Sequence, residues 1–324
     1  MAVKTYIEAL SDGLREEMQR DKNVYMLGED IGQYGGAFKV TKGFLEEFGP
    51  ERIIDTPLAE SAIIGVAIGS AMMGMRPVAE MQFADFVACG FNQLINNAAK
   101  MHYRWGAAVP MVVRLPSGGG VRGGPFHSQN PEAWFCHTPG LKVVAPSTPN
   151  DAKGLIKSAI RDNNPVLYFE HKYLYRRIKE EVPEGDFSIP IGRGDIKRPG
   201  ADVSIITYGS MVHASLEAAE KLAAEGINVE VMDLRSLLPY DQEMIADTVK
   251  KTNRAVVVHE ATRTCGFAAE VMAFIVEELF THLDAPVKRV TSIDSPVPYS
   301  PPLEDFFMPN ADKIAQAVRE VAAF

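Results

Sequence analysis

The stretch Asp55–Ser61, which reads Asp-Thr-Pro-Leu-Ala-Glu-Ser, decides the fold because it joins a short strand to a long apolar helix. Residues 52–54 predict the strand, and Pro57 interrupts it. Residues 62–75, rich in Gly and Ala, predict a tightly packed, buried helix. The stretch therefore places one carboxylate, Glu60, at a strand-to-helix turn next to the predicted core.

A carboxylate in this position has two interpretations. Against the core, loss of solvation raises the pKa of a carboxyl group, so that Glu60 can hold or pass a proton near neutral pH. Alternatively, Glu60 is a first-turn residue favoured by the helix dipole, with Thr56 or Ser61 as the cap. Position alone favours the second interpretation, so the choice depends on the rest of the sequence.

The first half of the chain alternates strands with helices. Residues from Ile7 to Met18 predict an amphipathic helix with its apolar side chains on one face. Residues 151–161 predict another helix, capped by Thr148 and opened by Pro149. Continuous apolar runs are typical of strands buried on both faces of a parallel sheet, and they occur at 24–27, 77–81, 111–115, 142–144 and 166–169.

A second alternation follows a stretch rich in charge, Pro and Gly. Residues 203–207, 229–232, 255–258 and 287–291 predict strands, and residues 212–225 and 267–280 predict helices. Repeated strand-helix-strand units imply right-handed crossovers. The predicted fold is therefore α/β with two doubly wound domains, at residues 1–185 and 201–324, joined by a linker at 186–200.

Composition narrows the class of protein. The 324 residues are 46% hydrophobic and 23% charged, as in a globular enzyme with a sizeable core. A net charge of −9 argues against nucleic acid or an anionic membrane as the main partner. Cys89, Cys136 and Cys265 are far apart and predict reduced thiols in the core or at a pocket edge.

No signal peptide or membrane-spanning stretch is visible in the sequence. We therefore expect a soluble protein of the cytoplasm, or of the mitochondrial matrix if a leader has been removed.

One glycine-rich motif is misleading. Gly118–Gly123 fits G-x-G-x-x-G and follows a predicted strand, but Gly124-Pro125 comes next, where a nucleotide-binding helix should open. We interpret this segment as a loop that positions His127.

Several blocks in register resemble the beta subunit of the thiamine-diphosphate-dependent 2-oxo acid dehydrogenases, the decarboxylating component of the pyruvate and branched-chain complexes. The resemblance runs from about Thr5 to Phe324, and its domains are a transketolase-like pyrimidine-binding domain followed by a transketolase C-terminal-like domain. The blocks are 55–60, 80–86, 116–120, 127–129, 139–144 and 159–165.

The resemblance implies roles for individual residues. Glu60 would share a proton with the cofactor's aminopyrimidine ring, and Leu58, Gln82 and Phe86 would contact the same ring. Many relatives have Tyr where this chain has Phe86, so the stacking face is kept and a hydroxyl is lost. His127 would contact the cofactor-bound intermediate and help to transfer the acyl group to a lipoyl-lysine, a task that suits imidazole near neutral pH.

Half of such an active site is missing from the sequence. No Gly-Asp-Gly is followed some thirty residues later by Asn, the pattern with which thiamine enzymes hold magnesium and diphosphate. The resemblance implies that an alpha subunit supplies this half in an α2β2 heterotetramer, with the cofactor between the subunits.

The resemblance also implies a potassium ion held by oxygen ligands, mostly backbone carbonyls, of Met111, Ala159, Ile160, Asp162 and Asn164. The alternative is an ordinary helix end whose last turn is satisfied by Asp and Asn.

A docking site is implied as well. In relatives, residues matching Asp284 and the terminal carboxylate of Phe324 receive basic residues of the dihydrolipoyl acyltransferase core. The alternative is that Asp284 is a turn residue and Phe324 a frayed end.

Substrate choice is less defined. Residues 127–133 resemble branched-chain members, whereas 151–156 are shared widely, so a branched-chain 2-oxo acid is slightly favoured over pyruvate. The alternatives are an acetoin dehydrogenase beta subunit, a transketolase-like protein and a non-catalytic docking subunit. Transketolase would carry the diphosphate domain in the same chain, and a docking subunit would not need both Glu60 and His127.

Overall fold

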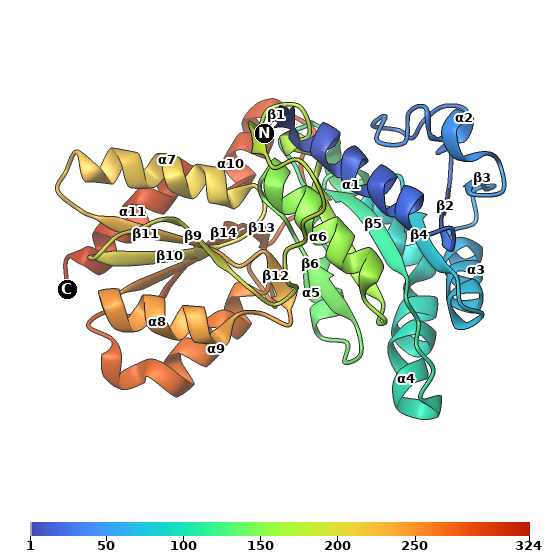
Figure 1. The fold of residues 1–324 in the computed structure, drawn as a ribbon. Helices are drawn as coiled ribbons and strands as arrows, with labels where there is room; N and C mark the ends of the chain where they lie inside the picture. The colour runs from blue at the N-terminus through green and yellow to red at the C-terminus, as the bar shows by residue number, and fades with distance from the viewer. Residues whose placement is uncertain (1) are drawn as a thin grey trace.

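The computed structural model describes residues 2–324 and shows two α/β lobes joined edge to edge (Figure 1). The first lobe contains β1 (Ala2–Thr5), α1 (Tyr6–Arg20), β2 (Val24–Gly28), α2 (Phe44–Phe48), β3 (Ile53–Asp55), α3 (Glu60–Met72), β4 (Arg76–Glu80), η1 (Ala84–Gly90), η2 (Gln93–Ala98), α4 (Ala99–Trp105), β5 (Val112–Ser117), η3 (Gly124–Phe126), α5 (Glu132–Cys136), β6 (Lys142–Val144), α6 (Pro149–Arg161), β7 (Val166–His171), η4 (Lys172–Leu174) and β8 (Lys179–Val182).

The second lobe contains β9 (Asp195–Arg198), β10 (Val203–Thr207), α7 (Met211–Ala223), β11 (Val229–Asp233), β12 (Ser236–Leu238), α8 (Gln242–Thr252), β13 (Ala255–Thr262), α9 (Ala268–Leu279), η5 (Phe280–His282), β14 (Lys288–Ser292), α10 (Pro301–Phe307) and α11 (Ala311–Ala322).

The first sheet has the order β12-β6-β7-β5-β4-β2-β3, and its strands are parallel except β12. Alternate residues of a strand point to opposite faces. On β2, Val24 and Met26 pack under α1 and α6, while Tyr25 and Leu27 pack under α3 on the other face. The strands are buried on both faces, as the continuous apolar runs predict.

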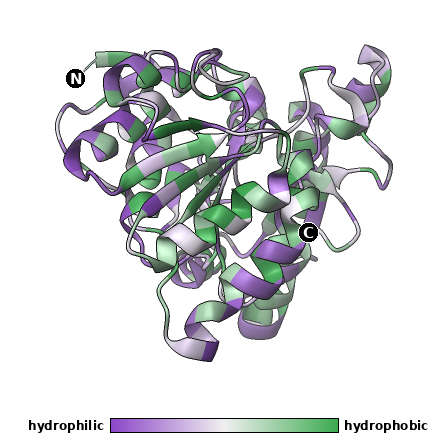
Figure 2. Ribbon diagram, turned by 90° about the vertical axis from the view of Figure 1, so that its right-hand side faces the viewer, coloured by the Kyte–Doolittle hydropathy of each residue, from purple (hydrophilic) through white to green (hydrophobic). Residues whose placement is uncertain are grey.

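The second sheet has the order β14-β13-β10-β11-β9, with only β9 antiparallel. Helices α7 and α11 cover one face, and α8 and α9 cover the other (Figure 1). The fold is therefore α/β with two doubly wound domains. Figure 2 shows hydrophobic residues concentrated in the interior strands.

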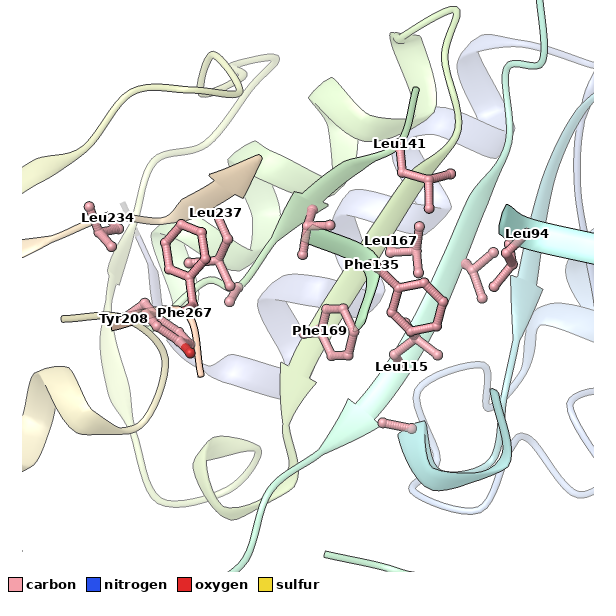
Figure 3. Close-up of a cluster of buried hydrophobic side chains, with 14 of the residues drawn as sticks. Leu94, Leu115, Phe135, Leu141, Leu167, Phe169, Tyr208, Leu234, Leu237 and Phe267 are labelled. Carbon is pink, nitrogen blue, oxygen red and sulfur yellow. The ribbon is translucent and has the colours of Figure 1, made fainter. Parts of the chain in front are cut away.

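The two lobes share a core. Strand β12 leaves the second lobe and pairs with β6 at the edge of the first sheet. One apolar cluster continues across the boundary, from Phe135 and Phe169 to Tyr208 and Phe267 (Figure 3). Because a shared core resists hinge motion, side chains from both lobes can contribute to one site.

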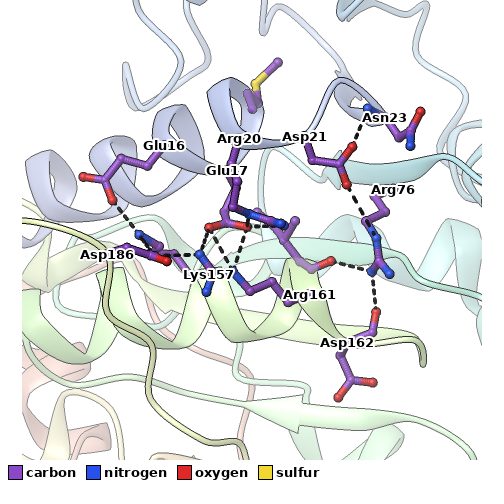
Figure 4. Close-up of polar contacts among 12 residues, drawn as sticks. Glu16, Glu17, Arg20, Asp21, Asn23, Arg76, Lys157, Arg161, Asp162 and Asp186 are labelled. Atoms are coloured by element: carbon purple, nitrogen blue, oxygen red, sulfur yellow. Dashed lines mark hydrogen bonds and ion pairs between the residues drawn. The ribbon is translucent and has the colours of Figure 1, made fainter.

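Residues 186–200, expected as a linker, are fixed at both ends. Asp186 forms ion pairs with Lys157 and Arg161 of α6 (Figure 4), and residues 195–198 form β9 of the second sheet.

Most predicted elements are present. Thr148 caps α6 by accepting from the Asp151 amide, with Pro149 at the first position. The loop after Gly118–Gly123 opens only the short η3, so the segment is not a nucleotide-binding turn. Cys89, Cys136 and Cys265 are free thiols, and Cys89 lines a surface hollow, but Cys265 is exposed rather than in the core. Within residues 2–324, no helix is both long and apolar enough to cross a bilayer.

The prediction of a tightly packed, buried helix after Glu60 is wrong for one face of α3. Ile63, Ile64 and Ala67 are buried, but Val66 is 56% exposed and Met73, just after the helix, is 85% exposed. The helix is apolar all round, and this chain covers only one side of it.

Candidate functional site

Glu60 is the first residue of α3, at the carboxyl end of the first sheet. No side chain caps this helix, so neither Thr56 nor Ser61 acts as the cap. The Glu60 side chain is partly exposed and lines an open hollow of about 660 Å³, together with Val66, Cys89 and Gln93. The carboxylate therefore faces a space large enough for a heterocyclic ring.

A second carboxylate lies close to Glu60. Glu29 follows β2 directly and is 4% exposed, and neither of its oxygens has a hydrogen-bond partner among residues 2–324. Burial raises the pKa of Glu29, and the charges of Glu60 and Asp30 raise it further. Such an orphaned buried group indicates a missing partner.

The sequence reasoning missed Glu29. One sequence feature could have indicated it: Glu29 is an acidic residue directly after the buried strand β2. That strand pairs with β3, the strand before Glu60.

Gln82, Phe86 and His127 form a second group, which Gln82 joins to the residue after Glu29. The Gln82 amide donates to Asp30 at 3.1 Å, and Asp30 follows Glu29 in the chain. The His127 ring meets the Phe83 ring edge-on at 4.6 Å between centroids and the Phe86 ring at 5.6 Å. Gln82, Phe86 and His127 therefore form an arc beyond the carboxyl ends of β4 and β5, while Glu60 begins α3 beyond the carboxyl end of β3. Leu58 is 81% exposed on the turn.

A buried ion network fixes the strand ends that carry this arc. The guanidinium of Arg114 on β5 is fully buried and bonds Glu80 of β4 and both carboxylate oxygens of Glu170 on β7. Tyr175 also donates to Glu170 at 2.7 Å. Because Glu80 immediately precedes the segment of Gln82 and Phe83, the network sets where these side chains stand.

Lys172 lies behind the same aromatic cluster. Its ammonium donates to the Gly118 carbonyl at 2.8 Å and sits 5.6 Å from the centre of the Phe83 ring. Burial lowers the pKa of Lys172 to about 8, although the charges of Asp85, Glu260 and Glu304 oppose this change. The lysine thus binds the base of the loop that carries His127.

Four of the five predicted potassium ligands, Ala159, Ile160, Asp162 and Asn164, lie at or just after the end of α6. Met111 lies directly before β5, where its carbonyl accepts from the Val166 amide at 2.9 Å. The Arg76 guanidinium donates to the carbonyls of Ile160 and Asp162 (Figure 4), and Lys142 forms an ion pair with the Asp162 carboxylate. Asp162 also accepts from the Asn164 amide groups. Among the described residues, no cluster of three or more His, Cys, Asp or Glu side chains could hold a metal. A site made mostly of backbone carbonyls would not form such a cluster.

The two predicted docking residues lie at one end of the second domain. Asp284 is more than half exposed, and its carboxylate stands 3.7 Å from Arg254. Phe324 follows α11, and Glu320 near that end pairs with Lys288 at the start of β14. Since Asp284 just precedes β14, both residues are near the same edge of the sheet.

Comparisons with known proteins agree with this geometry. Residues 3–177 match the family described as "Transketolase, pyrimidine binding domain", and residues 192–314 match "Transketolase, C-terminal domain". The chain is 53% identical over its full length to the full-length "2-oxoisovalerate dehydrogenase subunit beta" of Bacillus subtilis. The chain belongs to the family of 2-oxo acid dehydrogenase beta subunits.

Other members of this family are nearly as similar. "Pyruvate dehydrogenase E1 component subunit beta" of Bacillus subtilis is 46% identical, and all of both chains is covered. An acetoin:2,6-dichlorophenolindophenol oxidoreductase subunit beta of Cupriavidus necator is 47% identical, with 99% of this chain and 98% of the relative covered. A solved "Split gene transketolase, inactive beta4 tetramer" aligns over 98% of both chains, with a TM-score of 0.81 and 25% identity.

Proposed function

We propose that this beta subunit forms part of a thiamine-diphosphate-dependent enzyme that oxidatively decarboxylates a 2-oxo acid and passes the acyl group to a lipoyl domain. The observation that carries the proposal is the Glu60 carboxylate, which faces the hollow beside the orphaned carboxylate of Glu29. The matched pyrimidine-binding family supports dependence on thiamine diphosphate.

The residues at the hollow fit the pyrimidine half of that cofactor. When bound, thiamine diphosphate supplies a carbon nucleophile for the carbonyl group of a 2-oxo acid. Glu60 would share a proton with a pyrimidine ring nitrogen, which requires a carboxyl group that tolerates both protonation states. Outside the lining, Phe86 lies three residues before Cys89 on η1 and offers a ring for stacking, and Gln82 offers an amide beside Asp30.

A second chain must complete the site. The sequence lacks the motif that binds magnesium and diphosphate, and α3 presents an open apolar face next to Glu60. Gly65 and Gly69 lie on this helix, and a Cβ added at either would meet nothing within 4 Å. Glycine weakens a helix interior, so two glycines without a packing reason in this chain support close packing against an alpha subunit.

Binding of the cofactor to the separate chain tests this requirement. Isothermal titration of the isolated beta chain with thiamine diphosphate and magnesium should show no tight binding, and adding the alpha subunit should restore it. Tight binding and turnover by the isolated chain would contradict the proposed α2β2 assembly.

His127 would act in acyl transfer to the lipoyl domain. Its imidazole is partly exposed between Phe83 and Phe86, where it can meet both a bound cofactor and an incoming substrate. His127→Ala should impair acylation of a lipoyl domain more than decarboxylation followed with an artificial electron acceptor. Equal losses would place His127 in decarboxylation instead.

A branched-chain 2-oxo acid is the favoured substrate because the 2-oxoisovalerate relative is 53% identical, against 46% for the pyruvate and 47% for the acetoin relative cited above. Turnover of the α2β2 complex with 2-oxoisovalerate, pyruvate and acetoin decides among them, and the largest kcat/KM is expected for 2-oxoisovalerate. Preference for acetoin would favour the second candidate, an acetoin dehydrogenase.

Two further assignments belong to the same proposal. A potassium ion at the carbonyls near Asp162 would order the end of α6, and removing potassium should lower the thermal stability of the complex. Asp284 and the end of the chain at Phe324 would receive basic residues of the acyltransferase core.

A further inference from the structure

The loop that carries His127 is closed at its base and held from outside. It spans residues 118–130, between β5 and α5, and the Gly118 amide donates to the Gln129 carbonyl at 3.1 Å. The middle of the loop is exposed, with Phe126 at 64%. Only the short η3 lies within the loop, so besides the ring contacts of His127 with Phe83 and Phe86, its path depends on contacts near the two ends.

One carboxylate from the second domain contacts both ends. Glu260 lies on β13, and its Oε1 accepts from the Gly119 amide at 2.6 Å and from the Asn130 side-chain amide at 2.8 Å. Its Oε2 contacts His171 Nε2 at 2.7 Å and accepts from the Ser210 hydroxyl at 2.8 Å. The carboxylate thus joins the loop to β7 of the first sheet and to the start of α7.

The contact requires a close approach of the loop backbone. Gly118 has a φ of +88°, and a Cβ added there would lie 1.9 Å from His171 Nε2. Only glycine therefore fits where the loop passes over the His171–Glu260 pair.

Glu260 remains charged in this environment. Its side chain is 6% exposed, and burial opposes the charge. The charge of His171, with hydrogen bonds from His171, Gly119 and Ser210, outweighs burial and lowers the pKa of Glu260 to about 2. Charge-assisted hydrogen bonds of this kind are roughly twice as strong as neutral ones.

A second carboxylate, from α10, contacts the loop at residues 120 and 122. The buried Glu304 accepts from the Gly120 amide at 3.0 Å and pairs with Arg122 at 2.7 Å. Arg122 also pairs with Asp305, whose side chain is 67% exposed. The exposed Arg122–Asp305 ion pair is solvated and contributes little to the stability of the loop. A change at Asp305 is therefore a control on the same loop.

We propose that Glu260 of the second domain is a positioning residue for His127, because it binds both ends of the His127 loop and joins them to β7 and α7. It acts alongside Glu304 and alongside Asp85, which accepts from the Gln129 backbone and side-chain amides. The inference rests on the acyl-transfer role proposed for His127. It gives the second domain a part in that step, in addition to any docking of the acyltransferase core.

The test uses the assembled α2β2 complex with Glu260→Gln, Glu260→Asp and the control Asp305→Asn. Gln keeps the shape of the side chain, but its NH2 group cannot accept a hydrogen bond. Either Gly119 and Asn130, or His171 and Ser210, therefore lose their acceptor. A displacement of about 1 Å can cost about 100-fold in rate. We expect Glu260→Gln to lower the kcat of lipoyl-domain acylation by about that factor, with the KM unchanged. Decarboxylation to an artificial acceptor should change far less.

Three comparisons separate positioning from a general structural role. Glu260→Asp, which keeps the charge, should recover part of the lost acylation. Glu260→Gln combined with His127→Ala should be no slower than His127→Ala alone, since both act through one group. Asp305→Asn should leave both rates unchanged. Additive losses in the double variant, or equal losses in acylation and decarboxylation, would overturn the proposal.

Hydrogen exchange, which does not depend on enzyme activity, distinguishes the positioning role of Glu260 from the acyl-transfer role of His127. Hydrogen exchange of the amides at 118–130 should quicken in Glu260→Gln while that of β5 and β7 stays slow. Should Glu260→Gln fail to assemble, Asn130→Ala removes one of the four contacts and should show the same change to a smaller extent. Unchanged loop exchange would overturn the positioning role of Glu260. Faster exchange with no effect of His127→Ala on acylation would instead overturn the proposed role of His127.

Discussion

Replacing Gly69 by Ala should have opposite effects on the isolated beta chain and on its assembly. Gly69 lies inside α3, is exposed, and would have no atom within 4 Å of an added Cβ. Alanine in a helix interior is more stable than glycine by about 0.5–1 kcal/mol, so the isolated chain should gain about that much in free energy of unfolding. If the alpha subunit packs closely on this face, the added methyl group forces the two chains apart.

The loss on assembly can be estimated from overpacking. An extra methyl group in a close contact typically costs about 1–3 kcal/mol. At 1.4 kcal/mol for each factor of ten, association with the alpha subunit should weaken by about 5- to 150-fold. Urea unfolding of the isolated chain and a titration of alpha against labelled beta chain measure the two effects separately.

Gly13 provides a matched control. It also lies in a helix interior, on α1, but an added Cβ would stand 2.6 Å from Ile156 Cγ2. Gly13→Ala should therefore destabilise the isolated chain and leave the α3 surface unchanged. The reasoning is refuted if Gly69→Ala weakens the isolated chain, or if it assembles with alpha as tightly as the unchanged protein.

Three other changes test the interior and the docking edge. Arg114→Met should cost about 3–5 kcal/mol in unfolding free energy, because it strands the buried carboxylates of Glu80 and Glu170; a loss below about 1 kcal/mol in urea unfolding would contradict the network. Burial raises the pKa of Glu132 from 4.5 to about 7. The folded chain is therefore most stable, as far as this group is concerned, below pH 4.5, and it loses that stability as pH rises through about 7. Glu132→Gln should therefore stabilise the chain at pH 8 by up to about 3 kcal/mol and little at pH 4.5, and an equal effect at both pH values would contradict the shift. Asp284→Ala should weaken surface-plasmon binding of the complex to the acyltransferase's binding domain, and more so at low salt; unchanged affinity for both Asp284→Ala and a deletion of Phe324 would place docking elsewhere.

Local sequence signals predicted the elements whose stability is local. Residues 24–27 and 166–169 are apolar throughout, and a strand covered by helices on both faces needs that pattern. Thr148 and Pro149 mark the start of α6 because a cap acts on the next three residues. Such signals depend on neighbours in the chain, so they can be read from it directly.

Contacts between distant segments left no comparable signal. Residues 236–238 form β12 at the edge of the other domain's sheet, a pairing set by how the two lobes meet. Glu260 lies on a buried strand 133 residues after His127, and nothing near it in sequence indicates the loop that it holds. The open face of α3 was mistaken for core because an apolar helix looks the same whether its own chain or another covers it.

Hydrogen exchange at the thiazolium carbon of thiamine diphosphate tests the central assignment of Glu60 most directly. In the assembled complex, Glu60→Gln should slow deuterium exchange at this carbon by about 100- to 10,000-fold, because general acid–base groups contribute that much. Glu46→Gln, which removes a carboxyl group from the first turn of α2 and outside this hollow, should leave the exchange near its original rate. Exchange in Glu60→Gln at the original rate, with the cofactor bound and the complex assembled, would mean that Glu60 only begins a helix.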